Sequence, residues 1–157
     1  MRAHYCFLVL FAFSVATAIL AADAETSAET AAPSSNAEPG TYFLSLRRAN
    51  DTVLHLPPQV KAAQYSEEKI PVLVGLHGMG ENFPSNFQRE TAFDETADRL
   101  GAATLYPLGS PSVAPSLTGH TWNAGACCLS VEDDESFLVS VLQNITQLVP
   151  GADPSRV

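Results

Sequence analysis

The sequence predicts an α/β fold in which a mostly parallel sheet packs against helices. Two continuous apolar runs, at residues 70–76 and 102–106, have the length and composition of strands that are buried on both faces. A segment with helical spacing of apolar residues follows each run, ending near residue 101 and near residue 148. Alternation of buried strands with amphipathic helices is typical of a parallel sheet.

The first 24 residues are expected to be a cleaved signal peptide. Arg2 is the only fixed side-chain charge before Asp23, and an apolar run lies between them. Ala22 and Ala24 flank Asp23 as a cleavage site, so we expect cleavage after Ala24, with Ala22 as the alternative. An uncleaved membrane anchor is the other interpretation, because the run just reaches spanning length. Small and hydroxylated residues late in the run favour cleavage, and we therefore expect a secreted protein that is not membrane-bound.

Residues 25–40 are expected to form a flexible linker, and residues 41–157 the globular part. The linker is rich in Ala, Ser, Thr, Glu and Pro, and it has no large apolar side chain to offset the entropy of ordering. The first element after it is predicted to be a hairpin of strands 42–46 and 52–56, which Pro57 and Pro58 end.

A buried strand at residues 70–76 is predicted next, followed by a helix. Ser85 is its expected N-cap, Phe93, Ala97 and Leu100 recur at helical spacing, and Gly101 is the expected stop. The second buried strand, residues 102–106, follows directly and is closed by a proline.

A long loop at residues 108–130 leads to a last helix, capped by Asp133 or Asp134. We prefer capping and interaction with the helix dipole to a catalytic role for these two carboxylates. The apolar positions that line one face of this helix are Phe137, Val141, Ile145 and Leu148. Val157 is expected to begin another strand, which the helix needs to complete its crossover. The chain is therefore expected to hold only the N-terminal part of its domain.

The charge excludes some classes of partner. The net charge is −9, and it is unchanged by signal cleavage, which removes one charge of each sign. An acidic surface with no run of Lys or Arg repels phosphate backbones and anionic lipid, so we expect no nucleic-acid partner. His55, His77 and His120 lack the spacing of metal ligands, and no nucleotide-binding glycine motif occurs, so we expect no metal and no cofactor.

Two kinds of covalent modification are candidates. After signal cleavage the cysteines that remain are Cys127 and Cys128, and adjacent cysteines rarely bond to each other comfortably. We therefore expect disulfides with at least one partner outside this chain, and we prefer a disulfide to a nucleophilic role for Cys127. Asn50 and Asn144 begin sequons and are candidate glycosylation sites on a secretory route.

Two segments carry the chemistry. Residues 73–82, LVGLHGMGEN, deliver a buried strand into a glycine-rich loop, where backbone can approach a ligand. A plain strand-to-helix turn would also contain glycine, and that interpretation stays open on this segment alone. The second segment, residues 119–128, reads GHTWNAGACC and is followed by an acidic stretch before a Phe-Leu pair and by DPSRV at the end.

The order of these motifs resembles the secreted feruloyl esterase and polyhydroxybutyrate depolymerase family, which has the α/β-hydrolase fold. The resemblance covers residues 42–157. It implies a carboxylic ester hydrolase acting on plant cell-wall polysaccharide or on a polyester, through a Ser-His-Asp triad. In α/β-hydrolases, one oxyanion donor is a backbone N–H of the loop after the strand.

The resemblance also implies roles for individual residues. Met79 is the expected oxyanion donor, with Gly80 second, while His77 and Gly78 support the loop. A triad histidine usually comes after the serine, so His77 is not the expected base. Trp122 and Asn123 are expected to shape the substrate cleft, with core packing as the alternative for Trp122. Many relatives carry a cysteine at the position of Met79, so the disulfide of that cysteine is in doubt here.

The sequence has no G-x-S-x-G motif. Because the nucleophile precedes the acid and the base in this fold, the whole triad is expected after Val157, and the 157 residues alone are expected to be inactive. The rival interpretation is a secreted, non-catalytic protein that keeps a hydrolase-like half as a binding or structural module. An unpaired sheet edge and an apolar helix face argue against it.

Overall fold

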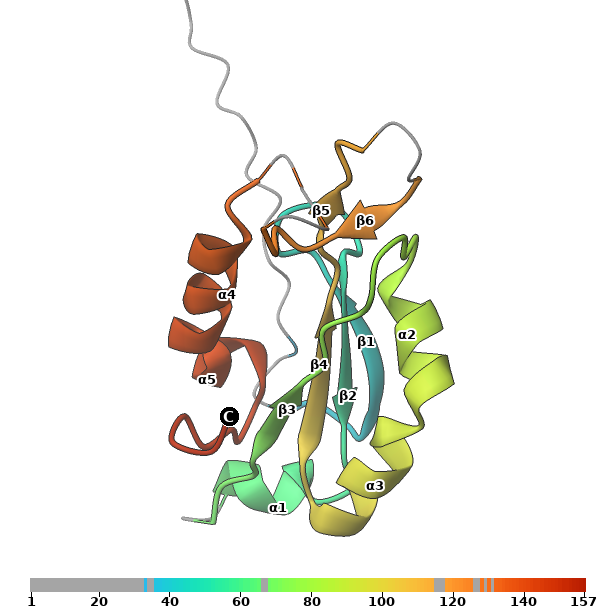
Figure 1. Ribbon diagram of the computed structural model, residues 1–157. Coiled ribbons are helices and arrows are strands. Elements are labelled where there is room, and N and C mark those ends of the chain that lie inside the picture. Colours follow the sequence, from blue (N-terminus) through green and yellow to red (C-terminus); the bar gives the residue numbers. More distant parts are fainter. Residues whose placement is uncertain are drawn as a thin grey trace, which may run out of the picture.

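The fold is a four-stranded sheet with helices on both faces. The computed structural model describes residues 33, 36–65, 68–114, 118–125, 128, 130 and 132–157. Helices α4 and α5 cover one face and α2 and α3 the other, while a second, two-stranded sheet lies beyond one end of the strands (Figure 1). The elements are β1 (Gly40–Leu44), β2 (Thr52–Leu56), α1 (Val60–Tyr65), β3 (Val72–Val74), α2 (Pro84–Thr91), α3 (Phe93–Leu100), β4 (Ala103–Pro107), β5 (Ser110–Pro111), β6 (His120–Thr121), α4 (Asp134–Gln143) and α5 (Ile145–Leu148).

The fold begins earlier than expected. The predicted signal peptide and most of the predicted linker lie outside the described residues. Ala37, however, is only 5% exposed and belongs to the hydrophobic core, and Gly40 is the first residue of β1. The last residues of the predicted linker are therefore part of the packed structure.

The strand order is β1-β2-β4-β3. β1 pairs antiparallel with β2, β2 pairs antiparallel with β4, and β3 pairs parallel with β4. The mixed α/β class and the hairpin are thus confirmed, but the expectation of a mostly parallel sheet is wrong. The physical reason is that the second strand of the hairpin occupies one edge of β4, so only the other edge receives a parallel neighbour.

The two strands that the sequence predicts to be buried, β3 and β4, are buried to different extents. All five residues of β4 are buried, as expected for a strand covered on both faces. In β3, in contrast, Leu73 is 45% exposed, and Leu76 just after the strand is 46% exposed. The expectation of burial on both faces is wrong for this strand. An apolar groove lies against Leu73, bordered by Phe93 and Leu100 of α3.

The predicted helix after β3 is two helices. Phe83 is the N-cap of α2, Pro84 occupies its first turn, and no side chain caps it, so the prediction of Ser85 as N-cap is wrong. Proline is suited to this position because its missing N–H would have no helical partner. Ala92, with φ 52°, separates α2 from α3. The predicted stop at Gly101 is confirmed by its φ of 68° and its N–H donating to Asp98 O.

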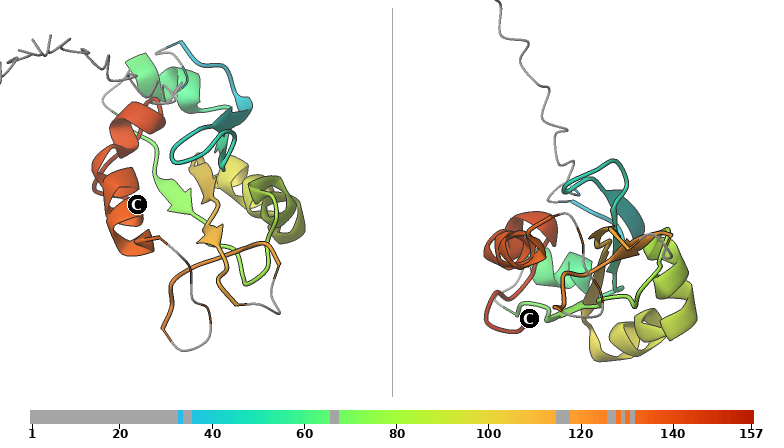
Figure 2. Two further views of the ribbon diagram at one scale, coloured as in Figure 1. Left: turned by 90° about the horizontal axis from the view of Figure 1, so that it is seen from above. Right: turned by 45° about the horizontal axis from the view of Figure 1, so that its top comes forward.

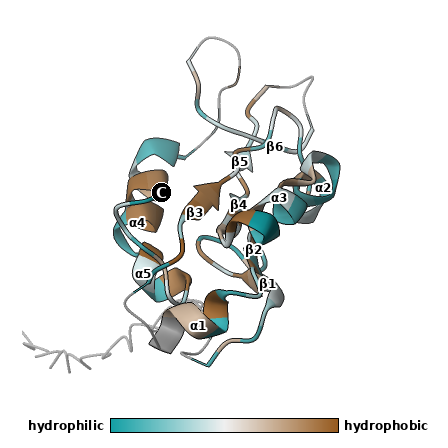
Figure 3. Ribbon diagram, turned by 90° about the horizontal axis from the view of Figure 1, so that it is seen from below, coloured by the Kyte–Doolittle hydropathy of each residue, from teal (hydrophilic) through white to brown (hydrophobic). Residues whose placement is uncertain are grey.

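The C-terminal helices close the core. The side chain of Asp133 accepts a hydrogen bond from Ser136 N, so the predicted cap is confirmed. Val141, Ile145 and Leu148 are buried in the core between the helices and the sheet, as the helical pattern predicted. Figure 3 shows hydrophobic residues on β3 and in α4 and α5, the elements that contribute to this core.

After α5 the chain returns to β3. Ile70 and Ala152 form a parallel bridge, and Val72 N donates to Arg156 O over 2.9 Å. The marked C-terminus lies beside β3 in the views of Figures 1 and 2. Val157, which was expected to begin a strand, has no strand assignment, although the residues before it run beside β3.

Candidate functional site

The candidate site lies where β3 and β4 end. Because these strands are parallel, their carboxyl ends lie at the same edge of the sheet, and loops 75–83 and 108–112 leave from that edge. Ligands of open α/β sheets bind beyond the carboxyl ends of parallel strands. The small β5–β6 sheet lies at this end of the molecule (Figure 1) and brings residues 120–125 to the two loops.

His77 is buried, with 4% exposure, and both of its ring nitrogens have partners. Its Nδ1 lies 2.6 Å from Gly78 O, and its Nε2 lies 2.8 Å from Gly109 N. A carbonyl oxygen accepts and a backbone N–H donates, so these contacts require a neutral imidazole with its proton on Nδ1. Burial lowers the pKa of His77 below its ordinary value of 6.5, which also favours this neutral form.

Trp122 contacts His77 in two ways. Its indole Nε1 donates to His77 O over 3.1 Å, and the two rings lie with centroids 5.2 Å apart at an interplanar angle of 39°. The side chain is half-buried, so part of it faces solvent. The structure therefore brings together two predicted site residues that are 45 positions apart in the sequence.

The far end of the β3 loop is held by β6. Gly80 N donates to His120 O over 2.9 Å, and His120 N donates to Glu81 O over 2.6 Å. The approach is close, because a Cβ on Gly119 would lie 2.6 Å from Gly80 O. Burial opposes ionisation of Glu81, but hydrogen bonds from Asn86 and from two backbone amides outweigh it and lower its pKa.

Gly78 and Met79 lie between these two anchored positions. Met79 is 58% exposed, and its backbone N–H has no acceptor among the described residues. α2 begins only at Pro84, so this amide is not part of a helix. The amide of Gly80, the second predicted donor, is already paired with His120. Of the two predicted donors, Met79 is therefore the one whose N–H has no partner among the described residues.

Two sulfur atoms lie close together near this loop, one from residues 73–82 and one from residues 119–128. Cys128 is disulfide-bonded, and its Sγ lies 4.0 Å from Met79 Sδ. Cys127 lies outside the described residues, so the predicted pairing stays a prediction. Met79 is thus next to one of the two candidate cysteines.

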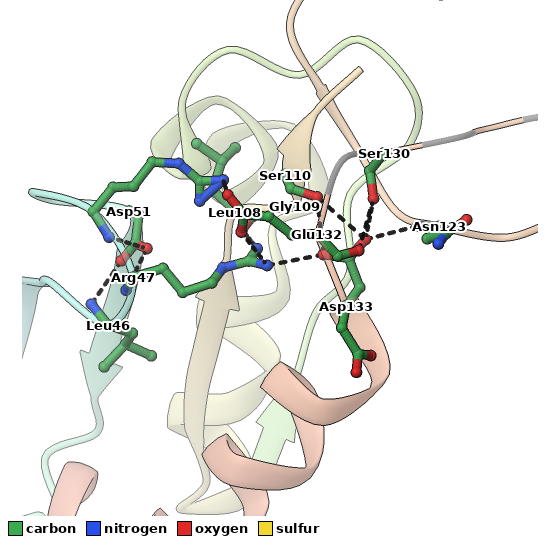
Figure 4. Close-up of polar contacts among 12 residues, drawn as sticks. Leu46, Arg47, Asp51, Leu108, Gly109, Ser110, Asn123, Ser130, Glu132 and Asp133 are labelled. Carbon is green, nitrogen blue, oxygen red and sulfur yellow. Dashed lines mark hydrogen bonds and ion pairs between the residues drawn. The ribbon is translucent and has the colours of Figure 1, made fainter. Parts of the chain in front are cut away.

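The buried carboxylate of Asp134 accepts hydrogen bonds from several segments and so fixes the residues around 108–130. The sequence did not predict this role. Asp134 is 5% exposed, and several hydrogen bonds converge on it from partners that are labelled in Figure 4. The donors are Arg47 Nη1 at 2.9 Å, Asn123 N at 2.7 Å, Ser130 Oγ at 2.8 Å and Ser110 Oγ at 3.2 Å. Burial opposes its ionisation, but the donors outweigh that effect and hold its pKa below the ordinary value.

Arg47 connects this carboxylate to the hairpin. Its guanidinium also pairs with Glu132 at 3.0 Å, donates to Leu108 O at 2.7 Å and lies 3.7 Å above the ring of Phe137. Asp133 caps the helix, as predicted, but Asp134 does not. Arg47 is 87 positions away from Asp134, and no local sequence signal reports a contact across that distance.

The remaining predicted residues lie apart from this cluster or at its surface. Asn123 is exposed and is held through its backbone by Asp134. Asn50 lies in the β1–β2 turn, and Asn144 lies between α4 and α5. Within the part of the chain that the structure describes, no three His, Cys, Asp or Glu side chains are grouped so that they could hold a metal.

No model of a known protein family matches the chain, and neither a curated protein nor a solved structure shows significant similarity to it.

Proposed function

We propose that this chain forms the oxyanion-binding half of a secreted carboxylic ester hydrolase with the α/β-hydrolase fold, whose nucleophilic serine lies after Val157. One observation carries the proposal: the loop that follows β3 is fixed on both sides and presents the amide of Met79, which has no protein acceptor among the described residues. A backbone N–H from this loop is one of the two oxyanion donors in that fold.

The anchors make the donor rigid. His77 fixes the start of the loop through Gly109, and His120 fixes its end. A donor that is held in place before the reaction stabilises the developing charge of a tetrahedral intermediate without a cost of reorganisation at that moment. A protonated His77 would lose its bond from Gly109, so its low pKa serves the geometry and not proton transfer.

Trp122 supplies a wall for an acyl or leaving group. It is half-buried, packs on His77 and is followed by Asn123, whose exposed side chain can contact substrate. An aromatic wall fits a feruloyl group or the backbone of a polyester, the two substrate classes that the motif resemblance implies. Whole-protein activity, secretion and substrate class all belong to this proposal.

The test uses the full-length protein and a p-nitrophenyl ester. Met79→Pro removes the amide proton, and Met79→Ala keeps it and removes only the side chain. Loss of one oxyanion donor is expected to lower kcat by about 10²–10³-fold in Met79→Pro, with little change in Met79→Ala. Equal activity of the two variants would contradict the assignment of the donor.

A second experiment addresses the class of protein. The 157-residue chain alone is expected to show no turnover above a heat-killed control, because it has no G-x-S-x-G serine. Turnover by this chain that a serine-directed inhibitor abolishes would show the proposal to be wrong. A full-length protein without esterase activity would favour the non-catalytic module.

A further inference from the structure

We infer that Asn50 is an N-glycosylation site and that the first sugar of its glycan lies over an apolar groove between Phe43 and Phe83. The inference rests on the secretory route that the signal peptide predicts, and it is independent of ester hydrolysis. It also separates Asn50 from Asn144, which the sequence alone treats as equal.

The surroundings of Asn50 leave its carboxamide accessible. Asn50 is exposed in the β1–β2 turn, and its φ of 54° lies in the left-handed region, which asparagine tolerates. Its backbone N–H donates to Ser45 Oγ, but no described residue bonds its carboxamide. A group attached to Nδ2 therefore displaces no protein contact.

A groove of about 400 Å³ begins at this side chain. Ala49 and Asn50 of the β1–β2 turn line it together with Phe83 and Pro84 at the start of α2. Phe43 also lines it and is 56% exposed, and Phe83 is 64% exposed. Two exposed aromatic side chains that line one groove leave apolar surface in water, which a ligand can cover. A pyranose ring has a face of C–H groups that packs on such rings, while its hydroxyl groups stay in water.

The burial of Thr52, the third residue of the sequon, indicates whether glycan transfer precedes or follows folding. Thr52 is fully buried, and its hydroxyl donates to Asp51, which itself accepts backbone bonds from Leu46, Arg47 and Arg48. A transferase that must reach this hydroxyl can do so only before β2 is formed. Modification therefore occurs on the nascent chain, and the folded turn then keeps the glycan exposed.

The chemical step is a glycosyl transfer. The donor is an oligosaccharide linked through its anomeric carbon to a lipid diphosphate. The Asn50 nitrogen forms a bond to the anomeric carbon, the bond from that carbon to the diphosphate oxygen breaks, and the nitrogen loses one proton. The lipid diphosphate leaves, and no oxidant or reductant is needed.

Asn144 provides a matched comparison. Its Nδ2 already donates to Ser140 O over 2.8 Å at the end of α4, and its neighbour Ile145 is buried in the core. A glycan on this nitrogen would have to share it with the helix end. Glycan at Asn50 is therefore compatible with the folded structure, whereas glycan at Asn144 would weaken the end of α4, and we expect the folded, secreted chain to carry glycan at Asn50 and little or none at Asn144.

The experiment expresses the full chain in a eukaryotic host that glycosylates secreted proteins. Intact mass and peptide mapping of the secreted chain are compared for wild type, Asn50→Gln and Asn144→Gln. The expected result is a glycan that is lost in Asn50→Gln and kept in Asn144→Gln. A secreted chain with unmodified Asn50, or a chain that never enters the secretory route, would overturn the inference.

The position of the sugar is tested by thermal unfolding. Trimming with an endoglycosidase that leaves one N-acetylglucosamine is expected to preserve a Tm roughly 2–4 °C above that of Asn50→Gln from the same host. Phe83→Ala should abolish this difference, because the sugar loses the ring on which it packs. A difference that persists in Phe83→Ala would show that the glycan does not use the groove.

Discussion

At the scale of single residues, His77 links the site to pH. It is bonded as a neutral ring, and its pKa lies below 6.5 in the folded protein. The unfolded chain therefore binds a proton more readily than the folded one as the pH falls below 6.5. Stability from this group is fully present above that pH and is lost as the pH falls towards the folded pKa. We expect the midpoint of urea unfolding to decrease from pH 7.5 to pH 5.5.

The control for this prediction is a variant without the ring. His77→Gln removes the titrating ring and should flatten the dependence in this pH window. An identical slope in the wild type and in His77→Gln would assign the pH dependence to other groups.

Asp134 is the second residue on which the site depends. Asp134→Asn removes the more buried of the two carboxylates that pair with Arg47, whose side chain is only 14% exposed, and leaves it the more exposed Glu132 alone. Removing one partner of a buried ion pair costs about 3 kcal/mol. Urea unfolding of Asp134→Asn should show this loss, and Asp133→Asn, an exposed cap one position earlier, should show a much smaller one. Equal losses would mean that Asp134 only contributes to capping.

At the scale of elements, the segment after β4 approaches β6 closely beside the candidate site. A Cβ on Gly109 would lie 2.3 Å from Thr121 O, whereas a Cβ on Gly78 would meet nothing within 4 Å. Gly109→Ala must separate the two segments and is expected to cost about 2 kcal/mol, while Gly78→Ala should cost little. The only tryptophan, Trp122, reports the change, because its fluorescence depends on its contact with His77. Unaltered emission in Gly109→Ala would contradict this account.

Local sequence patterns predicted the individual helices and strands well, but they did not predict which strands lie beside one another. The hairpin, the buried strand β4 and the cap at Asp133 each follow from a signal within a few residues. The direction of the sheet did not follow, because the position of β2 beside β4 depends on packing across 50 residues of sequence. The break at Ala92 was missed for a related reason: alanine carries no signal for the left-handed conformation that it adopts there.

The same contrast holds for the candidate site: some of its residues were singled out from the sequence, but their contacts were not predicted. The glycine-rich loop was singled out from its residues, and Trp122 from the order of motifs that the family resemblance depends on. Their contact was not, and neither was the hub at Asp134, whose partners Arg47, Ser110, Asn123 and Ser130 are drawn from three separate segments (Figure 4). An acidic residue at a helix start is usually a cap, and only the folded arrangement reveals a different role.

At the scale of the whole molecule, net charge and exposed apolar surface have opposite effects on the association of copies of the chain. The net charge of −9 keeps copies apart, while the groove of about 460 Å³ against Leu73, Phe93 and Leu100 favours contact. Within the described residues, no helix has the length and apolar character needed to cross a bilayer.

This opposition predicts association that depends on salt. Salt screens the repulsion between exposed charges but leaves the apolar attraction in place, so the 157-residue chain should associate more strongly at 1 M than at 0.05 M sodium chloride. Leu100→Lys places a charge on the border of the groove, where the leucine is 73% exposed, and should reduce this association in sedimentation velocity. Val139→Lys introduces the same charge on α4, away from the groove, and should behave as the wild type. Equal reduction by both variants would show that net charge alone, and not the apolar surface beside β3, controls association.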